Sequence, residues 1–555
     1  MSAPTPRARF LATGVGALAS LLFLSSCGRR ETPVEIANRE GILLISSGGD
    51  PTSIDPQLIQ TLNDSHISIA LFEGLTVPDP VTLEPKPGVA KTWEYDEKTL
   101  TWTFHLRPEA KWSNGDPVTA GDFVFSFQRI LTPELGADYA NMLYPIKNAQ
   151  SFNEGRLKDF SQVGVKALDD HTLQIQLEHP TGYFLELCYH QTYLPVHPPT
   201  IKKFNAMARR DSGWDKAETF VGNGPFVLTK YVLGEVVEVK KNPLYWNAAA
   251  IRLNGIRFFP IADVNAEERA FRNGALHITS TLPPPRIPAY RDTHSPYLRI
   301  MPVYGSYFYT FNTRKGKGPL NDPRVRLALC LAIDRQSLVD HVTKGGQIPS
   351  YTMTPPSEQY QPRAQLHEDV AEAQRLLAAA GYPGGKGFPS IELLYNSSDA
   401  HRAVAENLQA TWKKNLGVEV RLANAAVSAW LDRRHNADFD IIRAGWYGDY
   451  LDPSTFLELF SSDNDMEQSG WKSDAYDKLI LAARKEIDPA KRMEDFQQAE
   501  AILVAEAPVL PLYYYTTIIL IRPEVRGYEN NVLDQHIYTD VYLDPNATTP
   551  EPQKN

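Results

Sequence analysis

Residues 438–456 read DFDIIRAGWYGDYLDPSTF, and they carry the most informative pattern in the chain. An apolar run of strand-favouring residue types begins at Phe439 and contains one charge, Arg443. Strict alternation along a strand puts Arg443 on the same side as Phe439 and Ile441. A Gly-Asp turn that ends at Asp449 follows. The pattern therefore predicts a strand that carries an arginine into the protein and ends close to an aspartate.

The two charges of this stretch have two interpretations. A buried charge without a partner costs several kcal/mol, so Arg443 and Asp449 need partners wherever they are buried. In the first interpretation they pair with each other or with neighbours inside the fold. In the second they flank a cavity and hold the two charged ends of a zwitterion, such as the α-ammonium and the α-carboxylate of a free peptide. The sequence leaves both interpretations open.

Length and composition indicate a multidomain globular protein. A chain of 555 residues is too long for one core and predicts two or three domains. Apolar residues make up 43% of the chain and charged residues 22%, as in ordinary soluble proteins. The formal net charge of −10, without long runs of one sign, argues against nucleic-acid binding. The 26 tyrosines and 9 tryptophans suit a large, wet binding cavity.

The N-terminus has the features of an export signal. Arg7 and Arg9 precede an apolar stretch, residues 11–24, which is too short to span a bilayer comfortably. The stretch ends in Leu-Ser-Ser-Cys at residues 24–27, which resembles the lipobox of bacterial lipoproteins. That resemblance implies cleavage before Cys27 and a lipid anchor on Cys27, which needs no transmembrane helix. The alternative is a signal peptide, residues 1–27, that carries an incidental cysteine.

Residues 28–40 are charged and polar and are expected to form a tether above the membrane. The two later cysteines, Cys188 and Cys330, allow one disulfide in an oxidising compartment. Cys330 lies in the apolar, helix-like run 325–333, however, which favours a buried free thiol. No Cys/His spacing typical of a zinc site is present, so neither a metal site nor a cofactor is expected.

The secondary-structure pattern changes near Tyr304. Before it, strands dominate, such as the alternating run 100–106 and a strand pair over residues 163–177. After it, helices alternate with strands up to residue 515, as in an α/β lobe. One of these helices is predicted to end at Gly417, a typical C-cap residue.

Motifs for catalysis are missing from the sequence. It contains no Gly-x-Ser-x-Gly, no His-Glu-x-x-His, no phosphate loop that ends in Gly-Lys-Ser/Thr, and no dinucleotide fingerprint. The expectation is a protein that is not an enzyme. A secreted hydrolase remains the alternative, because the members of a catalytic triad need not be neighbours in sequence.

Many short motifs, in one order, resemble the family 5 extracellular solute-binding proteins, which include the binding proteins of bacterial oligopeptide importers. The similarity runs from about Leu43 to Asp544. The motifs that carry it include SIDP at 53–56, LFEGL at 71–75, WTFHLR at 102–107, AIDR at 332–335, WKKNLGV at 412–418, YYY at 513–515 and the stretch quoted first.

The resemblance implies an α/β fold: a type II periplasmic-binding-protein-like clamp of two lobes with an additional β-rich domain. By analogy, the first lobe is discontinuous and the β-rich domain is inserted into it. The expected ranges are 41–72, 198–304 and 516–546 for lobe I, 73–197 for the extra domain, and 305–515 for lobe II.

The resemblance also implies roles for single residues. Asp449 matches the family's aspartate for a peptide ammonium, and Arg443 and His401 match residues that take up the C-terminal carboxylate. The remaining implied contacts are the backbone of Gly445, Trp446 and Tyr447, which bonds to the ligand main chain as an added strand, and the aromatic side chains of Trp446, Tyr139 and Tyr515.

These roles imply a monomeric receptor, lipid-anchored in the periplasm or at the cell surface. It would bind short peptides by closing its lobes and deliver them to the permease and ATPase subunits of an ABC transporter.

The sequence departs from the family pattern at several positions near the site. The family's cysteine pair is replaced by Gly305 and Tyr447, and a carboxylate-binding lysine falls at Thr343, beside Lys344. Further departures are Gln60 and Thr310 at acidic positions and Val427 at a tryptophan position. They leave the ammonium site intact and keep a second ligand class open, namely murein-type peptides or another non-standard ligand.

Overall fold

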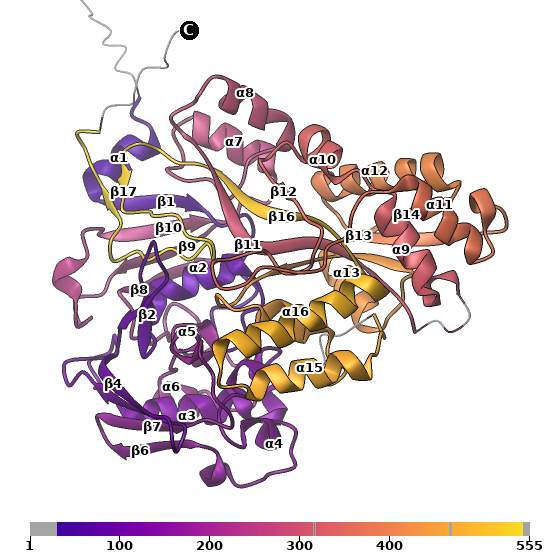
Figure 1. Cartoon of the computed structure of the whole chain (residues 1–555). Coiled ribbons are helices and arrows are strands. Elements are labelled where there is room, and N and C mark those ends of the chain that lie inside the picture. Colours follow the sequence, from indigo (N-terminus) through magenta and orange to yellow (C-terminus); the bar gives the residue numbers. More distant parts are fainter. Residues whose placement is uncertain (1–29, 315, 317, 465–468, 548–555) are drawn as a thin grey trace, which may run out of the picture.

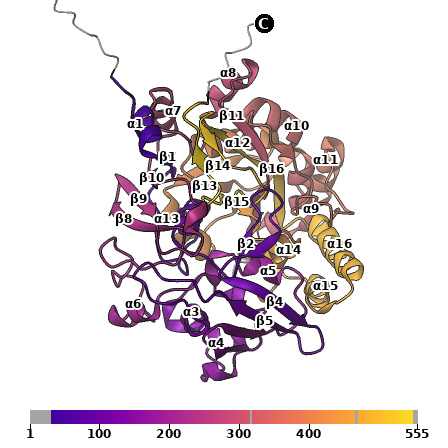
Figure 2. The ribbon, with the colours of Figure 1, turned by 90° about the vertical axis from the view of Figure 1, so that its left-hand side faces the viewer.

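The computed structural model describes residues 30–314, 316, 318–464 and 469–547. The described chain is built around three larger sheets, each with its own helices and core (Figure 1). We call the parts around the first, second and third sheet lobe I, the extra domain and lobe II. Figure 2 shows the extra domain below lobe I.

Lobe I contains a four-stranded sheet in which one parallel pair is followed by antiparallel pairs. Its strand order is β1 (Ile42–Ser46), β10 (Gly255–Phe259), β9 (Val236–Lys241) and β8 (Phe226–Val232). Helix α2 (Leu62–Leu71) packs against this sheet through Ile67 and Leu71. Helices α7 (Val264–Arg272) and α8 (Ile287–Asp292) complete the lobe (Figure 1).

The extra domain contains a second four-stranded sheet, which is antiparallel throughout. Its order is β4 (Ala90–Asp96), β5 (Thr101–Leu106), β7 (Thr172–Gln176) and β6 (Val165–Asp169). These strands confirm the ones predicted over residues 100–106 and 163–177. Helix α3 (Ala120–Leu131) covers the sheet, and its Phe123 and Phe127 share a core with Phe104 of β5.

Lobe II contains a six-stranded mixed sheet. Its order is β12 (Ile348–Pro349), β16 (Val509–Leu520), β11 (Leu298–Phe311), β15 (Ile441–Tyr447), β13 (Ile391–Asn396) and β14 (Val420–Ala425). Side chains alternate along β11, so Tyr307 faces one core and Phe308 the other. The first core is covered by α9 (Pro323–Leu331), α11 (Val370–Ala379) and α12 (Asp399–Leu416), and the second by α15 (Asp474–Lys485) and α16 (Pro489–Glu506). As predicted, α12 ends at Gly417, which has a φ of 69°.

Two long strands pass from lobe I into lobe II. Strands β11 and β16 have 14 and 12 residues, and their ladder shifts register between Pro302 and Ser306. Ile300 of β11 packs with lobe I side chains, whereas Tyr307 lies in the core of lobe II. The two lobes are therefore joined through the middle of a strand pair, close to the expected boundary at residues 304 and 305.

The central strand β15 confirms the predicted strand but corrects its side-chain pattern. Ile441 packs in the same core as Tyr307, whereas Phe439 packs on the other face with Ile442 and Trp430. Phe439 and Ile441 were expected on one side. They lie on opposite faces because β15 begins at Ile441, and strand alternation does not extend back to Phe439.

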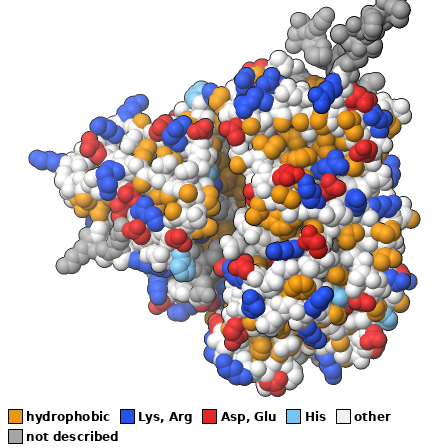
Figure 3. Space-filling model, turned by 180° about the vertical axis from the view of Figure 1, so that it is seen from behind, with side chains coloured by type: hydrophobic (Ala, Val, Ile, Leu, Met, Phe, Trp, Pro, Cys, Tyr) orange, Lys and Arg blue, Asp and Glu red, His pale blue; other side chains and the backbone are white. Residues whose placement is uncertain are grey.

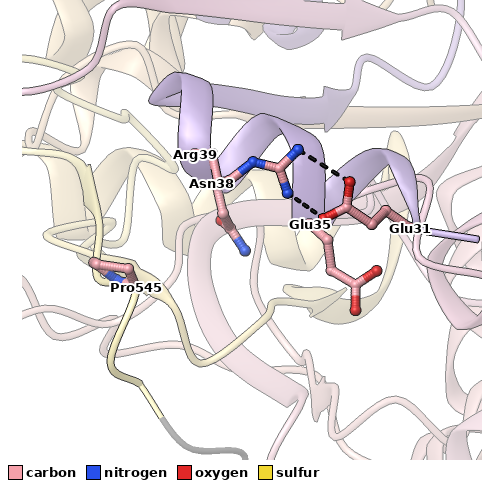
Figure 4. Close-up of a pocket in the computed structure, with 5 residues that line it drawn as sticks. All are labelled: Glu31, Glu35, Asn38, Arg39 and Pro545. Atoms are coloured by element: carbon pink, nitrogen blue, oxygen red, sulfur yellow. Dashed lines mark hydrogen bonds and ion pairs between the residues drawn. The ribbon is translucent and has the colours of Figure 1, made fainter. Parts of the chain in front are cut away.

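The expected tether over residues 28–40 is wrong for most of its length, because Pro33–Glu40 form helix α1. A capping box between Thr32 and Glu35 starts the helix, and Val34 and Ala37 bury its inner face. The Val34 amide also donates to the Gly274 carbonyl (2.9 Å). Local capping and two buried apolar side chains thus outweigh the polar composition. Figure 4 shows the outer side of the helix, where a small hollow next to the C-terminal segment contains the Arg39–Glu31 ion pair.

Cys188 and Cys330 are buried free thiols in two different cores, so the favoured prediction is confirmed and no disulfide joins them. The expected signal peptide and lipobox, residues 1–27, lie outside the described residues. Within the described part of the chain, no helix combines the length and apolarity needed to cross a bilayer.

Candidate functional site

A groove separates lobe II from the rest of the molecule. Figure 3 shows it from behind, with hydrophobic side chains in its depth. At the end of β15, Arg443, Gly445 and Trp446 are half-buried, and Tyr447 is 40% exposed. The structure brings the expected site residues together in two groups along this strand. We call them the basic end, which contains Arg443 and His401, and the acidic end, which contains Asp449.

At the basic end, Arg443 is surrounded by tyrosines. Its Nη2 donates to the hydroxyl of Tyr515, and its guanidinium lies 4.7 Å from the centre of the Tyr307 ring. Its Nη1 is 3.5 Å from Oδ1 of Asn396, and its Nε is buried without a hydrogen-bond partner. No carboxylate of the described residues pairs with Arg443. The guanidinium of Arg443 therefore has N–H donors that are not used inside the fold, and its planar shape suits a carboxylate.

His401 completes the basic end from helix α12. Its Nδ1 lies 3.2 Å from the hydroxyl of Tyr307. The ring of the same tyrosine contacts the guanidinium of Arg443. Burial, and then the charge of Arg443, lower the pKa of His401 to about 2. The imidazole is therefore neutral at physiological pH and offers a hydrogen bond rather than a charge.

At the acidic end, Asp449 has only weak partners. Its Oδ1 lies 3.6 Å from Nε2 of His190 in the extra domain, and its Oδ2 accepts a long hydrogen bond (3.4 Å) from the Thr455 hydroxyl. The Asp449 side chain is 16% exposed. No lysine or arginine in the described ranges forms an ion pair with it. Arg443 and Asp449 thus pair neither with each other nor with an opposite fixed charge of the described residues, and their neighbours inside the fold are His190, Thr455 and Tyr515.

Aromatic rings line both ends of the site. Trp446 lies 6.5 Å from Tyr139 of the extra domain, with the ring planes inclined by 23°. Tyr447 stacks on Tyr515 at 4.6 Å and 14°. The wall at the acidic end is thus shared between lobe II and the extra domain.

Between the two ends, one edge of β15 is open. On one side, residues 441–447 pair in register with β11, where Tyr447 faces Gly305. On the other side β13 pairs only with Ile441 and Ile442, and no described strand continues that ladder. The backbone from Gly445 to Tyr447 is therefore free to pair with an added strand. A Cβ on Gly445 would lie 2.3 Å from the Tyr515 hydroxyl, so a larger residue here would have to displace that ring.

The sequence analysis missed Arg434 on helix α13 (Val427–His435). Burial lowers the pKa of Arg434 to about 10, and the nearby charge of Arg443 adds to that lowering. Arg434 has no acidic partner among the residues that the structure describes. Its only sequence signal, the basic run 433–435 before β15, is also typical of a solvated helix end. Arg434 lies close enough to both Tyr139 and Arg443 for charge interactions with them, so it is placed between the two ends of the site.

The segment after Asp449 docks onto the extra domain. Tyr450 is buried in the core of that domain and stacks on Tyr183 at 4.1 Å and 2°. The Leu451 amide donates to Oε2 of Glu186 (2.8 Å). The site residues of lobe II are thus held against the extra domain in this conformation.

Comparison with known proteins places the chain in a family. The family model of the bacterial extracellular solute-binding proteins, family 5 (middle part), matches residues 84–468. The periplasmic oligopeptide-binding protein OppA of Salmonella typhimurium is 36% identical over 544 residues, which cover 95% of this chain and 97% of OppA. A periplasmic oligopeptide-binding protein of an oligopeptide ABC transporter from Borrelia burgdorferi has a similar structure, with a TM-score of 0.83, 34% identity and coverage of 91% of this chain and 100% of that one.

The murein tripeptide binding protein MppA of Escherichia coli gives a comparison of conformations. One MppA structure matches with a TM-score of 0.83 at 36% identity, covering 90% of this chain and 98% of MppA. The unliganded open form of MppA matches less well, with a TM-score of 0.70 at the same identity. The lobes of this chain are therefore arranged more as in the former structure. These matches confirm the predicted clamp fold, and the chain belongs to the bacterial extracellular solute-binding proteins of family 5.

Proposed function

We propose that the protein binds short peptides in the groove between its lobes and delivers them to an ABC importer. The observation that carries the proposal is the open edge of β15, with a cation at one end and an anion at the other, neither of which pairs with an opposite fixed charge among the described residues. Asp449 takes the ammonium of the peptide, and Arg443 with the neutral His401 takes its carboxylate. Main-chain bonds to the open edge supply affinity without reading side chains.

The spacing of the two ends sets the expected length of the peptide. From Arg443 to Tyr447 the strand extends about 13 Å, at about 3.3 Å per residue. This is the length of three to four extended residues, so we expect peptides of that size to bind best. Arg434 is a further cation that suits carboxylates of other ligands.

Closure of the clamp follows from contacts on both sides of the groove. A ligand held by Asp449 and Arg443 of lobe II also touches Tyr139 of the extra domain, so it stabilises the closed arrangement over the open one. The closed form is the state that a permease with ATPase subunits would recognise. Release of intact peptides, without turnover, belongs to the proposal and separates it from the hydrolase alternative.

A lipid anchor at Cys27 completes the proposed setting, in the periplasm or at the cell surface. The lipobox pattern supports it, and residues 28–32 would then link the anchor directly to α1. Mass spectrometry of the N-terminal peptide tests this: acyl chains are expected on Cys27 and are absent from Cys27→Ser. The protein is expected to act as a monomer.

A second candidate ligand class is favoured by Arg434. Murein-type peptides and acidic peptides carry a carboxylate besides the C-terminal one, and a second unpaired arginine suits it. Arg434→Ala should then weaken binding of such ligands and leave neutral tripeptides unaffected. Equal effects on both ligand types would remove this candidate.

Native mass spectrometry of the purified chain tests the main proposal. The expected spectrum shows a ladder of co-purified peptides, mostly of three to four residues. One discrete non-peptide species in every molecule would contradict peptide binding while leaving the fold unaffected.

A further inference from the structure

We propose that His66, Asp534 and His536 form a binding site in lobe I for one divalent metal ion of the zinc type. His66 lies on α2, and the other two residues lie in the C-terminal segment between β17 (Val525–Arg526) and β18 (Tyr542–Leu543). The cluster includes neither Arg443 nor Asp449, although Asp534 lies close enough to Tyr447 of β15 for its charge to act on that residue.

The three side chains converge on one point. Nε2 of His536 lies 3.1 Å from Oδ1 of Asp534, and Nε2 of His66 lies 4.0 Å from Oδ2 of the same carboxylate. One ligand atom from each residue lies within 4.8 Å of the others. Ligand atoms around tetrahedral zinc, with bonds of about 2.0–2.1 Å, are about 3.3 Å apart. Small side-chain rotations therefore bring all three atoms to bonding distance.

The donor set matches zinc in its chemistry. Two imidazole nitrogens and one carboxylate oxygen are ligands that zinc accepts, and they leave a fourth position for water. The main-chain carbonyl of Asp534 lies 2.6 Å from Nε2 of His66, so that nitrogen gives up this hydrogen bond and its proton when it binds the metal ion. Across the described ranges, the two histidines are the only basic side chains that pair with Asp534. A buried carboxylate without a fixed cation is a site that a metal ion would neutralise.

The histidines are held in place in different ways. The His536 side chain is 2% exposed and stacks on Tyr528, with ring centres 4.0 Å apart and planes inclined by 20°. Its Nδ1 is buried and finds no hydrogen-bond partner among the described atoms, which is uncommon for a buried polar atom. His66 is 17% exposed and gives solvent a route to the cluster. One ring is thus fixed and the other is accessible.

Metal binding would tie together two distant parts of the chain. His66 and His536 are far apart in sequence, so the cluster has no local Cys/His motif by which it could be recognised in the sequence. The segment that contains Asp534 also touches the strand that joins the lobes, since the Val532 carbonyl accepts from the Tyr304 amide (2.7 Å). A bound ion would fasten this segment to α2 next to that strand.

Cobalt and zinc titrations of the chelator-treated, purified chain test the proposal. We expect one Co²⁺ per chain with the visible absorption of tetrahedral cobalt, its displacement by one equivalent of Zn²⁺, and a higher melting temperature with Zn²⁺. His536→Ala and Asp534→Asn should each weaken Zn²⁺ binding by more than about 100-fold, beyond the 10- to 100-fold typical of losing an outer-shell partner. Asparagine suits position 534, because the φ of Asp534 is +54°.

His105→Ala is the matched control, since His105 is an exposed histidine 3.8 Å from Glu94. It should bind zinc like the parent. A melting curve without metal shows whether each variant is folded. If one variant is unfolded, the cobalt spectrum of the parent still tests whether the chain binds the metal. Absence of stoichiometric binding, or parent-like binding by Asp534→Asn, would overturn the proposal.

Discussion

Replacing the carboxylate of Asp449 by an amide is the sharpest test of the proposed binding mode. Asp449→Asn keeps the shape of the side chain and its hydrogen bond from Thr455, and removes only the negative charge. Of the neighbouring carboxylates, Asp452 pairs with Arg492, and Glu186 accepts from the Leu451 amide. The loss should therefore fall on ligands with a free N-terminus.

The structure sets the size of the effect. Removing one member of a buried charge pair costs about 2 to 5 kcal/mol or more in binding. The lower part of that range applies here, because the Asp449 side chain is 16% exposed and already has His190 at 3.6 Å. We expect about 2 to 3 kcal/mol, which is about 30- to 150-fold in Kd.

Calorimetric titration with trialanine and with N-acetyl-trialanine measures this effect as a double-mutant cycle. The acetylated peptide should bind the parent weakly and be insensitive to Asp449→Asn. Asp438→Asn, in an exposed pair with Arg433 at 3.0 Å, is the control and should change neither affinity. An equal loss for both peptides, or less than about a threefold loss for trialanine, would refute the ammonium assignment.

Three further predictions concern the basic end, the open edge and a buried carboxyl group. Arg443→Lys keeps the charge but loses the planar, forked set of donors of the guanidinium. In calorimetry, the affinity for trialanine should fall about tenfold, whereas the affinity for trialanine amide, which has no C-terminal carboxylate, should not change. Equal losses for the two peptides would contradict this. Gly445→Ala places a methyl group 2.3 Å from the Tyr515 hydroxyl, so peptide binding should weaken and thermal unfolding should show a loss of about 1 to 3 kcal/mol; parent-like affinity would argue against the open edge as the ligand site. Burial raises the pKa of Glu500 from 4.5 to about 7, so the folded chain holds this proton more tightly than the unfolded chain, and stability from this group falls as pH rises from 4.5 to 7. Relative to Glu500→Gln, the parent should lose about 3 kcal/mol of unfolding free energy over that interval, and a pH-independent difference in denaturant titrations would count against it.

Much of the fold could be predicted, because local signals agreed with tertiary contacts. Alternating apolar residues gave β5, and Gly417 ends α12 where a left-handed residue is needed. The tether prediction was wrong because the polar composition of residues 28–40 does not show the capping box at Thr32, which starts a helix there. The side-chain pattern at Phe439 failed because alternation holds only within a strand, and the start of β15 is set by its neighbours.

The site was predicted less completely. The family resemblance supplied Arg443, Asp449 and His401, but composition and spacing alone left their partners undetermined. Arg434 looks like an ordinary basic helix end until tertiary structure half-buries it near Tyr139. The His66 cluster depends on residues from the two ends of the chain, and only the folded topology of lobe I brings them together.

The open edge of β15 also bears on self-association. Unpaired strand edges on a protein surface template pairing with other chains and lead to aggregation. Here residues 443–447 have no partner strand on their second edge among the described residues. Opening of the clamp would expose this edge to other molecules. A bound peptide would then act as a protective cap, and the empty, open protein would be the form most prone to aggregate.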